Sequence, residues 1–379
     1  MKITNLKLDK FFLLFVIWFI FSNQAIATPF NVFDARTMAM GGVGVATGTH
    51  NAVFNNPALM TTVDEIHEWF LMLPAVAQER QDLDNLKDNL SSFQDAADRL
   101  DLVNNVANQN AVQAKLDDLD GIHYHASNNI ALMIAIPSRI LSGAVFLNSY
   151  EQYSAKPIIG GDNLTVPTYV STLAHRGFRV VENGVSTARA LNAEKGWASN
   201  MAIGVSAKFL LLETYNYETG LRSSEIKIDG SQGQNSSQFE LDVGMFKEFG
   251  VWKLALVGKN LLPGEFDLAG TNEKLKISPQ LRAGFAYQSR RAVLELNVDL
   301  LENDPVAFES ETKMVAIGWE YRPKRFFAIR AGANQNLVGR KANYFSTGIG
   351  LNISGFYIDI AGYTGNEGTG MAGQLGFQF

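Results

Sequence analysis

The chain of 379 residues contains no cysteine, which excludes disulfides, thiolate catalysis and metal sites built on cysteine. Charged residues make up only 18% of it and acidic ones outnumber basic ones, so the concentrated basic face that binds nucleic acid is lacking. Neither a phosphate-binding P-loop nor a Gly-x-Ser-x-Gly nucleophile elbow occurs. His123 and His125 are interpreted as ordinary loop residues rather than metal ligands. We therefore predict a non-enzymatic protein without a metal, a cofactor or a nucleic-acid partner.

Long apolar runs are also lacking, because a helix that crosses a bilayer needs about 20 apolar residues. The longest run, Phe11–Phe21, follows three lysines and precedes the small residues 25–27. This pattern is typical of a secretory signal peptide, which we predict at residues 1–27. Its removal leaves 29 basic and 37 acidic residues and a net charge of −8. Such a mature chain is either soluble outside the cytoplasm or crosses a membrane as strands.

The composition instead favours strands, with 33 Gly, 25 Phe and 11 Tyr. Many segments of about ten residues alternate between apolar and small or polar side chains. In the segment 294–300, four apolar residues alternate with Glu295, Asn297 and Asp299. Two carboxylates cannot face lipid, so this second face must border water or a polar lumen.

Fourteen such segments follow one another, and short connections alternate with mostly longer ones. This alternation of loop lengths is typical of a bacterial barrel with short periplasmic turns, longer outer loops and an even number of strands. We therefore predict an all-β fold, a transmembrane antiparallel β-barrel of about 14 strands over residues 63–379. The predicted strands are 67–77, 126–137, 140–153, 177–190, 197–215, 237–249, 251–261, 276–288, 291–302, 312–322, 325–334, 343–353, 356–364 and 370–379.

The first long loop, residues 78–120, differs from the others because its apolar residues recur every three or four positions. This spacing predicts an amphipathic helix or helical pair inserted in an outer loop. The helix is expected to pack on itself or cap the barrel mouth, and binding of a partner is the alternative. Its apolar stripe consists of Leu83, Leu86, Leu90, Phe93, Ala97, Leu100 and Val103.

The last strand ends on an aromatic residue at the chain terminus. Its large apolar residues share one face, while small and polar residues occupy the other. Such a tail resembles the C-terminal assembly signal read by the outer-membrane insertion machinery. The residues assigned to this signal are Met371, Leu375, Phe377 and Phe379.

Residues 28–62, ahead of the first strand, are predicted to form a hatch inside the barrel. Glycines permit close approach to the wall, and an Asn-Asn-Pro sequence fixes a turn. The residues singled out are Gly41, Gly42, Gly44, Asn55, Asn56 and Pro57. A dinucleotide fingerprint at these glycines is disfavoured, because no strand-turn-helix unit surrounds them.

Four charged residues are predicted to face the lumen as ion pairs. A carboxylate beside a guanidinium gains a partner for its desolvated charge. They are Arg282, Glu295, Asp299 and Arg330.

A family resemblance is carried by residues 33–46 and 55–59 near the N-terminus, together with residues 73–77 and 93–97. These residues resemble the TraF-like family of plasmid-transfer outer-membrane proteins over most of the mature chain. More distantly, Ala39-Met-Gly-Gly42 and Asn56-Pro-Ala58 look like FadL-type and PorV-type barrels of 14 strands. In FadL-like transporters the N-terminal hatch plugs the lumen and hydrophobic substrates pass around it, whereas PorV-like proteins serve secretion.

The resemblance implies two possible functions in the outer membrane of a Gram-negative bacterium. The first is a passive FadL-like channel for a small hydrophobic compound. The alternative is a non-enzymatic envelope component that acts as a scaffold or binds a conjugation or secretion partner. The expected partners are outer-membrane lipid, the barrel insertion machinery, a hydrophobic small molecule, and an envelope or transfer-apparatus protein.

Overall fold

The computed structural model describes residues 34–48, 52–63, 69–81, 85–136, 141–191, 198–267, 274–303, 311–339, 343–366 and 368–379. The predicted signal peptide and the first six residues of the predicted hatch lie outside the described residues. Over the described part of the chain, no helix is both long enough and apolar enough to cross a membrane.

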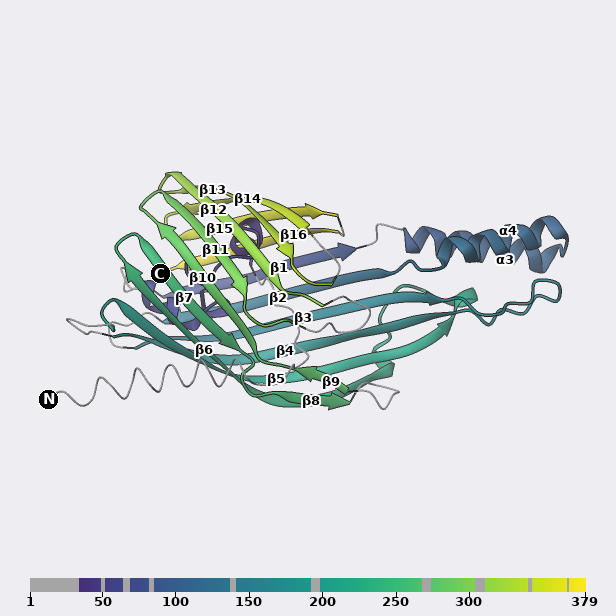
Figure 1. Cartoon of the computed structure of the whole chain (residues 1–379), viewed down its shortest axis with the longest axis horizontal. Coiled ribbons are helices and arrows are strands. Elements are labelled where there is room, and N and C mark those ends of the chain that lie inside the picture. Colours follow the sequence, from purple (N-terminus) through teal and green to yellow (C-terminus); the bar gives the residue numbers. More distant parts are fainter. Residues whose placement is uncertain are drawn as a thin grey trace.

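Fourteen antiparallel strands form a closed barrel, which confirms the predicted fold (Figure 1). Neighbours along the barrel are also neighbours along the chain, and β1 closes against β16. Every predicted strand overlaps one of the barrel strands. The strands are β1 Phe70–Gln81, β2 Tyr124–Ile136, β3 Ser142–Ile158, β4 Thr172–Leu191, β5 Met201–Gly220, β6 Gly233–Phe249, β7 Trp252–Lys259, β10 Gln280–Gln288, β11 Ala292–Asp299, β12 Met314–Lys324, β13 Phe327–Asn336, β14 Asn343–Ile353, β15 Phe356–Gly365 and β16 Thr369–Gln378.

A two-stranded sheet, β8 Gly264–Asp267 and β9 Lys274–Ile277, lies between β7 and β10 along the chain. The sequence analysis treated residues 262–275 as a loop. Strands of four residues are too short to produce a recognisable alternation, which explains why they were missed. The hairpin matters for the lumen, because Phe266 and Ile277 are buried.

The alternation of side chains separates a lipid-facing surface from a lumen. In β2, Ile130 and Ile134 are 47% and 42% exposed, whereas Ala131 and Met133 are buried. The same division holds in β16, where Met371 is exposed and Gln374 is buried. The barrel therefore presents an apolar outer surface, as a transmembrane barrel requires.

Strands β3 to β6 contain 17 to 20 residues, far more than the 9–11 that a tilted strand needs to cross the hydrocarbon core. Glu151, Arg179 and Glu213 stand directly across β3, β4 and β5. Arg179 donates to Glu151 at 2.7 Å and lies 3.7 Å from Glu213. The row shares the lipid-facing side of these strands, where charges are costly. We therefore assign the strand ends beyond this row, called the extension below, to the region outside the bilayer (Figure 1).

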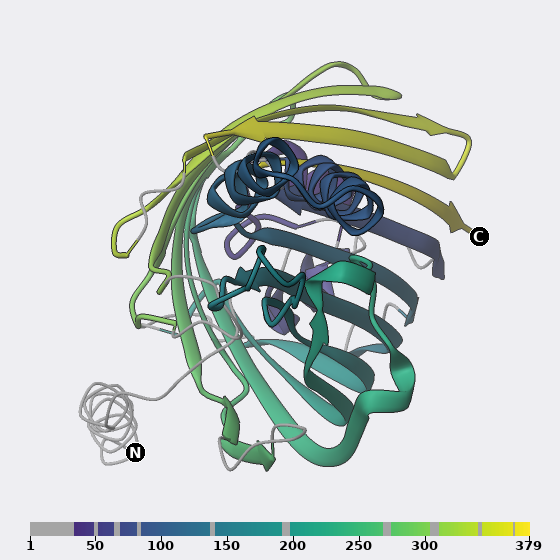
Figure 2. The ribbon, with the colours of Figure 1, turned by 90° about the vertical axis from the view of Figure 1, so that its right-hand side faces the viewer.

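The predicted helical insertion is a hairpin of α3 Leu86–Leu102 and α4 Val106–Leu119 (Figures 1 and 2). It packs on itself and against Tyr153, Ala155 and Leu173 of the extension. These three residues share the strand face of Glu151 and Arg179 by alternation, so the hairpin covers the outward face of the extension. Leu83 of the predicted stripe lies outside the described residues, and five of the other six stripe residues are buried. The sixth, Val103, follows the end of α3 at Leu102 and is 57% exposed.

Candidate functional site

The N-terminal segment lies inside the barrel and contacts opposite parts of its wall. Its helix α2, Ala35–Ala39, contacts β13 to β16 and β1, while the short helix η2, Pro57–Val63, contacts β3 to β6. Asp34 caps α2 by accepting a hydrogen bond from the Thr37 amide at 2.8 Å. Residues 34–63 are called the hatch below.

Gly41 allows the hatch to approach the wall at backbone distance. Its φ of 74° is a conformation that glycine adopts readily, and a Cβ there would lie 2.7 Å from the Ala333 nitrogen. On the wall side, a Cβ at Gly332 would lie 2.1 Å from the Met40 carbonyl carbon. Gly42 also has a positive φ, and Gly44 packs against Asn55. Gly41 therefore lies at a close approach between hatch and barrel, whereas Gly44 lies at a close contact within the hatch.

The predicted Asn-Asn-Pro turn ties the hatch together and to the opposite wall. Asn55 Nδ2 donates to Thr37 Oγ1 at 2.8 Å. Asn56 Nδ2 donates to the carbonyl oxygens of Val45 and Met245, at 2.8 and 3.3 Å. Pro57 begins η2, next to β5 and β6.

A buried ion network joins the hatch to β12, β13 and β15. Glu320 accepts hydrogen bonds from Arg36 of the hatch at 3.1 Å and from Arg330 at 2.7 Å. Arg322 lies 2.6 Å from the other Glu320 oxygen, and Arg330 also pairs with Asp359. The sequence analysis selected only Arg330 from this network. Glu320 could have been found, because it shares the inward face of β12 with Ala316 and Gly318.

Glu295 binds the backbone of the hatch, and no arginine of the described residues lies within ion-pair distance of its carboxylate. Its carboxylate accepts hydrogen bonds from the amides of Gly44, Ala46 and Thr47, at 3.1, 2.7 and 3.0 Å, and from Thr47 Oγ1. Three amides within four residues thus converge on one anion, as in a backbone nest. Arg282 and Asp299, two of the predicted charges, contact each other directly. Of the four predicted charges, Glu295 and Arg282 thus contact the hatch directly, while Asp299 and Arg330 bind other charged residues of the wall.

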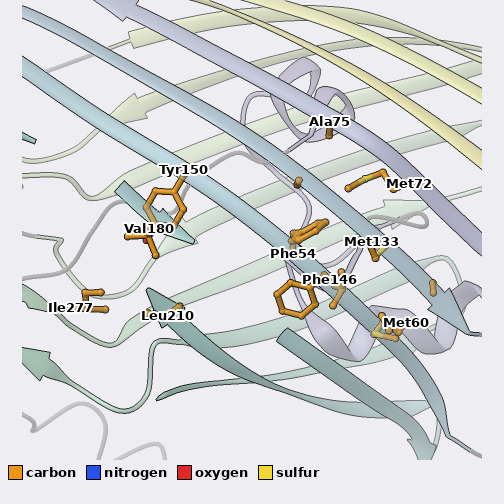
Figure 3. Packing of buried hydrophobic residues seen from close by; sticks show 14 of the residues in the cluster. Phe54, Met60, Met72, Ala75, Met133, Phe146, Tyr150, Val180, Leu210 and Ile277 are labelled. Atoms are coloured by element: carbon orange, nitrogen blue, oxygen red, sulfur yellow. The ribbon is translucent and has the colours of Figure 1, made fainter. Parts of the chain in front are cut away.

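The other side of the lumen is apolar. Phe54 and Met60 of the hatch join inward-facing residues of β1 to β5 in one buried cluster (Figure 3). Phe54 meets Phe146 edge to face, with ring centroids 5.4 Å apart. The cluster, here called the apolar track, consists of Val53, Phe54, Met60, Phe70, Met72, Ala75, Ala131, Met133, Ala135, Ala144, Phe146, Tyr150, Phe178, Val180, Ala188, Leu210, Leu212, Phe266 and Ile277. It extends from the outer β8–β9 hairpin to the first residues of β1.

The β1 strand is irregular where it borders the apolar track. Met72 pairs with Met133 of β2, whereas Ala75 pairs with Ala131. Leu73 and Pro74 thus stand opposite a single residue of β2, which is a β-bulge. Proline has no amide hydrogen to donate, so the strand pairing is weakest there.

These features define a class, a β-barrel of outer-membrane type whose lumen holds an N-terminal hatch between a charged wall and an apolar one. The chain belongs to the family described as "F plasmid transfer operon, TraF, protein", whose model matches residues 53–299. The predicted family is therefore confirmed. No curated protein sequence matches the chain.

Solved structures share the fold at low sequence identity. The toluene transporter TbuX of Ralstonia pickettii has a TM-score of 0.56 and 11% identity, over 92% of this chain and 98% of the other. The toluene transporter TodX of Pseudomonas putida has a TM-score of 0.55 and 10% identity, over 94% and 99%. A FadL homologue of Pseudomonas aeruginosa has a TM-score of 0.56 and 11% identity, over 94% and 99%. The predicted FadL-type fold is confirmed.

Proposed function

We propose that the protein is a passive channel for small hydrophobic compounds in the outer membrane of a Gram-negative bacterium. The observation that carries this proposal is the apolar track. It runs past the hatch from the outer hairpin to the β1 bulge, and it bypasses the charged wall. A buried apolar surface of this length lowers the free energy of a hydrocarbon relative to water along its path.

Two further findings support the proposal. The solved structures with this fold include proteins described as toluene transporters and a monoaromatic hydrocarbon channel. The charged luminal residues contact the hatch or one another, so their arrangement has a structural explanation that requires no catalysis.

The predicted assembly signal supports the outer-membrane location. Phe379 exchanges two backbone hydrogen bonds with Trp69, at 2.8 and 3.0 Å, and so extends the β1–β16 closure to the last residue. Its side chain and those of Met371 and Phe377 are exposed on the lipid-facing side. We propose that the insertion machinery recognises this strand.

A matched pair of valines on β4 tests the channel. Val180 is fully buried in the apolar track, whereas its neighbour Val181 faces outward. The V180W variant should obstruct the track, because tryptophan adds a bicyclic ring to a packed site. V181W places the same ring in lipid and is the control.

Uptake of a labelled monoaromatic hydrocarbon is measured in vesicles with a lipopolysaccharide outer leaflet, because hydrocarbons cross simple phospholipid bilayers unaided. We expect uptake above that of protein-free vesicles for the natural chain and for V181W, and a loss for V180W. Equal uptake by both variants, with both migrating as folded barrels on unheated gels, would contradict the proposed path.

The alternative function, binding of an envelope or transfer-apparatus protein, is supported by the tip of the α3–α4 hairpin. Leu102, Val103 and Val106 are 83%, 57% and 69% exposed there. Asn104 Nδ2 donates to the Thr165 carbonyl at 2.8 Å, which brings a second loop to the tip. The two helices carry six Asp against three Lys or Arg, so a partner with a basic surface fits.

Plasmid transfer frequency distinguishes this alternative from the channel. Serine at the three exposed tip positions should lower transfer from the host and leave hydrocarbon uptake intact, if the tip binds a transfer component. An unchanged transfer frequency would argue against a role of the tip in conjugation.

A further inference from the structure

The inward faces of the strands that form the apolar track also carry buried polar residues, of which Asn148 is one. Asn148 of β3 lies between Phe146 and Tyr150 on the inward face and is fully buried. Its Nδ2 donates to Glu182 Oε2 on β4 at 3.2 Å. Among the residues that the structure describes, its Oδ1 has no hydrogen-bond partner. A buried acceptor without a partner is uncommon and calls for an explanation.

Asn148 is one end of a polar belt around the lumen. Lys208 of β5 lies 3.6 Å from Glu182 and 2.9 Å from Asp242 of β6, and donates to Asn260 at 3.0 Å. Lys259 of β7 donates to the Phe54 carbonyl of the hatch. From β4 to β7 the belt is thus charged, and its position at β3 is neutral.

The belt divides the apolar track into two parts. Figure 3 shows the labelled residues in two groups, with Phe146 in one and Tyr150 in the other, and Asn148 lies between these two residues along β3. A hydrophobic molecule that moves between the two groups must cross the belt. The crossing is least costly where no ionised group is displaced, which is beside Asn148.

We propose that Asn148 and Glu182 form a polar binding site within the channel that accepts a hydrogen bond from the hydroxyl group of a permeating molecule. The substrate class is then a hydrophobic alcohol or phenol rather than a pure hydrocarbon. This inference rests on the proposed channel function and narrows its substrate.

The hydrogen-bonding capacity of the pair decides between ligand classes. Asn148 Nδ2 donates to Glu182, whereas the amide oxygen of Asn148 has no donor, so the group that the site lacks is a hydrogen-bond donor. A hydroxyl group supplies the missing donor, whereas a hydrocarbon leaves Oδ1 unpaired. A carboxylate-bearing molecule supplies no donor to Asn148 Oδ1 and is repelled by the negative charge of Glu182, so the site disfavours it.

The test compares 4-butylphenol with butylbenzene, which differ by one hydroxyl group. Saturable uptake of each is measured with the purified full chain in the lipopolysaccharide vesicles. The N148L variant has a side chain of similar size without polar atoms. N183L, which changes an exposed residue on the outward face of β4, is the matched control.

We expect N148L to lower the ratio of phenol to hydrocarbon uptake by about three- to tenfold, the effect of one hydrogen bond. N183L should keep the natural ratio. A natural ratio in N148L, with both compounds transported, would refute the binding site but not the channel. If the natural chain transports neither compound, the channel itself is refuted.

A second variant keeps the test decisive if N148L fails to fold. E182Q removes the negative charge, while Lys208 retains Asp242 as a partner. Uptake of 4-butylbenzoate relative to butylbenzene should rise in E182Q. Unchanged exclusion of the benzoate would show that Glu182 does not act on the permeating molecule.

Discussion

The hatch should depend strongly on Glu295, because this one carboxylate accepts hydrogen bonds from three of its backbone amides. Two amides, those of Gly44 and Ala46, donate to Oε1, while the amide and hydroxyl of Thr47 donate to Oε2. The substitution Glu295→Gln keeps the shape of the side chain. It replaces one of the two acceptor oxygens by an NH₂ group, which can only donate.

The magnitude follows from the donors that lose their acceptor. A hydrogen bond to a charged group contributes about 1.5–3 kcal/mol, and an orphaned buried donor costs about 1–3 kcal/mol. The glutamine amide can orient its oxygen toward only one of the two pairs of donors, so the other pair loses its acceptor. E295Q should therefore weaken hatch docking by about 3 kcal/mol. That is about a hundredfold shift toward the undocked state.

Hydrogen–deuterium exchange measures this shift directly. Peptides that cover residues 34–48 should exchange about a hundredfold faster in E295Q, while peptides from the barrel strands keep the natural rate. The control is Glu213→Gln, because Glu213 pairs with Arg179 on the outer surface and not with the hatch. Unchanged exchange of the hatch in E295Q would refute the role assigned to this carboxylate.

Three further perturbations test other parts of the structure. Gly332→Ala would place its Cβ 2.1 Å from Met40, so it should destabilise hatch docking by about 1–3 kcal/mol, measurable by the same exchange experiment. Arg222→Ala removes contacts of 2.6 Å with Asp98 and Asp101 of α3. Because these carboxylates are exposed, the hairpin should lose about 1 kcal/mol of stability, which is measured as faster proteolysis between α3 and α4. Burial lowers the pKa of His175, in the extension outside the bilayer, from 6.5 to about 4. The stability contributed by neutral His175 is therefore complete above pH 6.5 and is lost as the pH falls toward 4, by at most about 3 kcal/mol. In the His175→Phe variant, hydrogen exchange in the α3–α4 hairpin should no longer depend on pH over this range.

The strands could be predicted from the sequence because lipid and lumen impose opposite demands on alternate residues. The segment around Glu295 shows the reason, since a carboxylate every fourth residue between leucines has only one acceptable orientation in a membrane. Glycines and the Asn-Asn-Pro turn similarly indicated a segment that approaches a wall. These signals are local, and each depends on fewer than about ten residues.

Other features depend on contacts between distant residues and left no local signal. Arg36 and Glu320 are 284 positions apart, and only closure of the barrel places them together. In the sequence, Asn148 is one polar residue in an alternating strand, and only the pairing of β3 with β4 shows that it contacts Glu182. The predicted strands that form the extension are too short for a similar reason. Their outward-facing residues are covered by α3 and α4, so they lack the alternation of a lipid-facing strand.

The two walls of the lumen imply that a permeating molecule passes beside the hatch and does not expel it. Expulsion would break the Arg36–Glu320 pair and leave Glu295 without its donors, and breaking one buried pair alone costs about 3–5 kcal/mol. Burial of one small ring contributes only about 1.5–3 kcal/mol, which is too little to offset that cost. Phe54 and Met60, by contrast, meet the barrel through apolar contacts that a hydrophobic molecule can replace. We therefore expect side chains along the apolar track to move during transport while α2 stays in place.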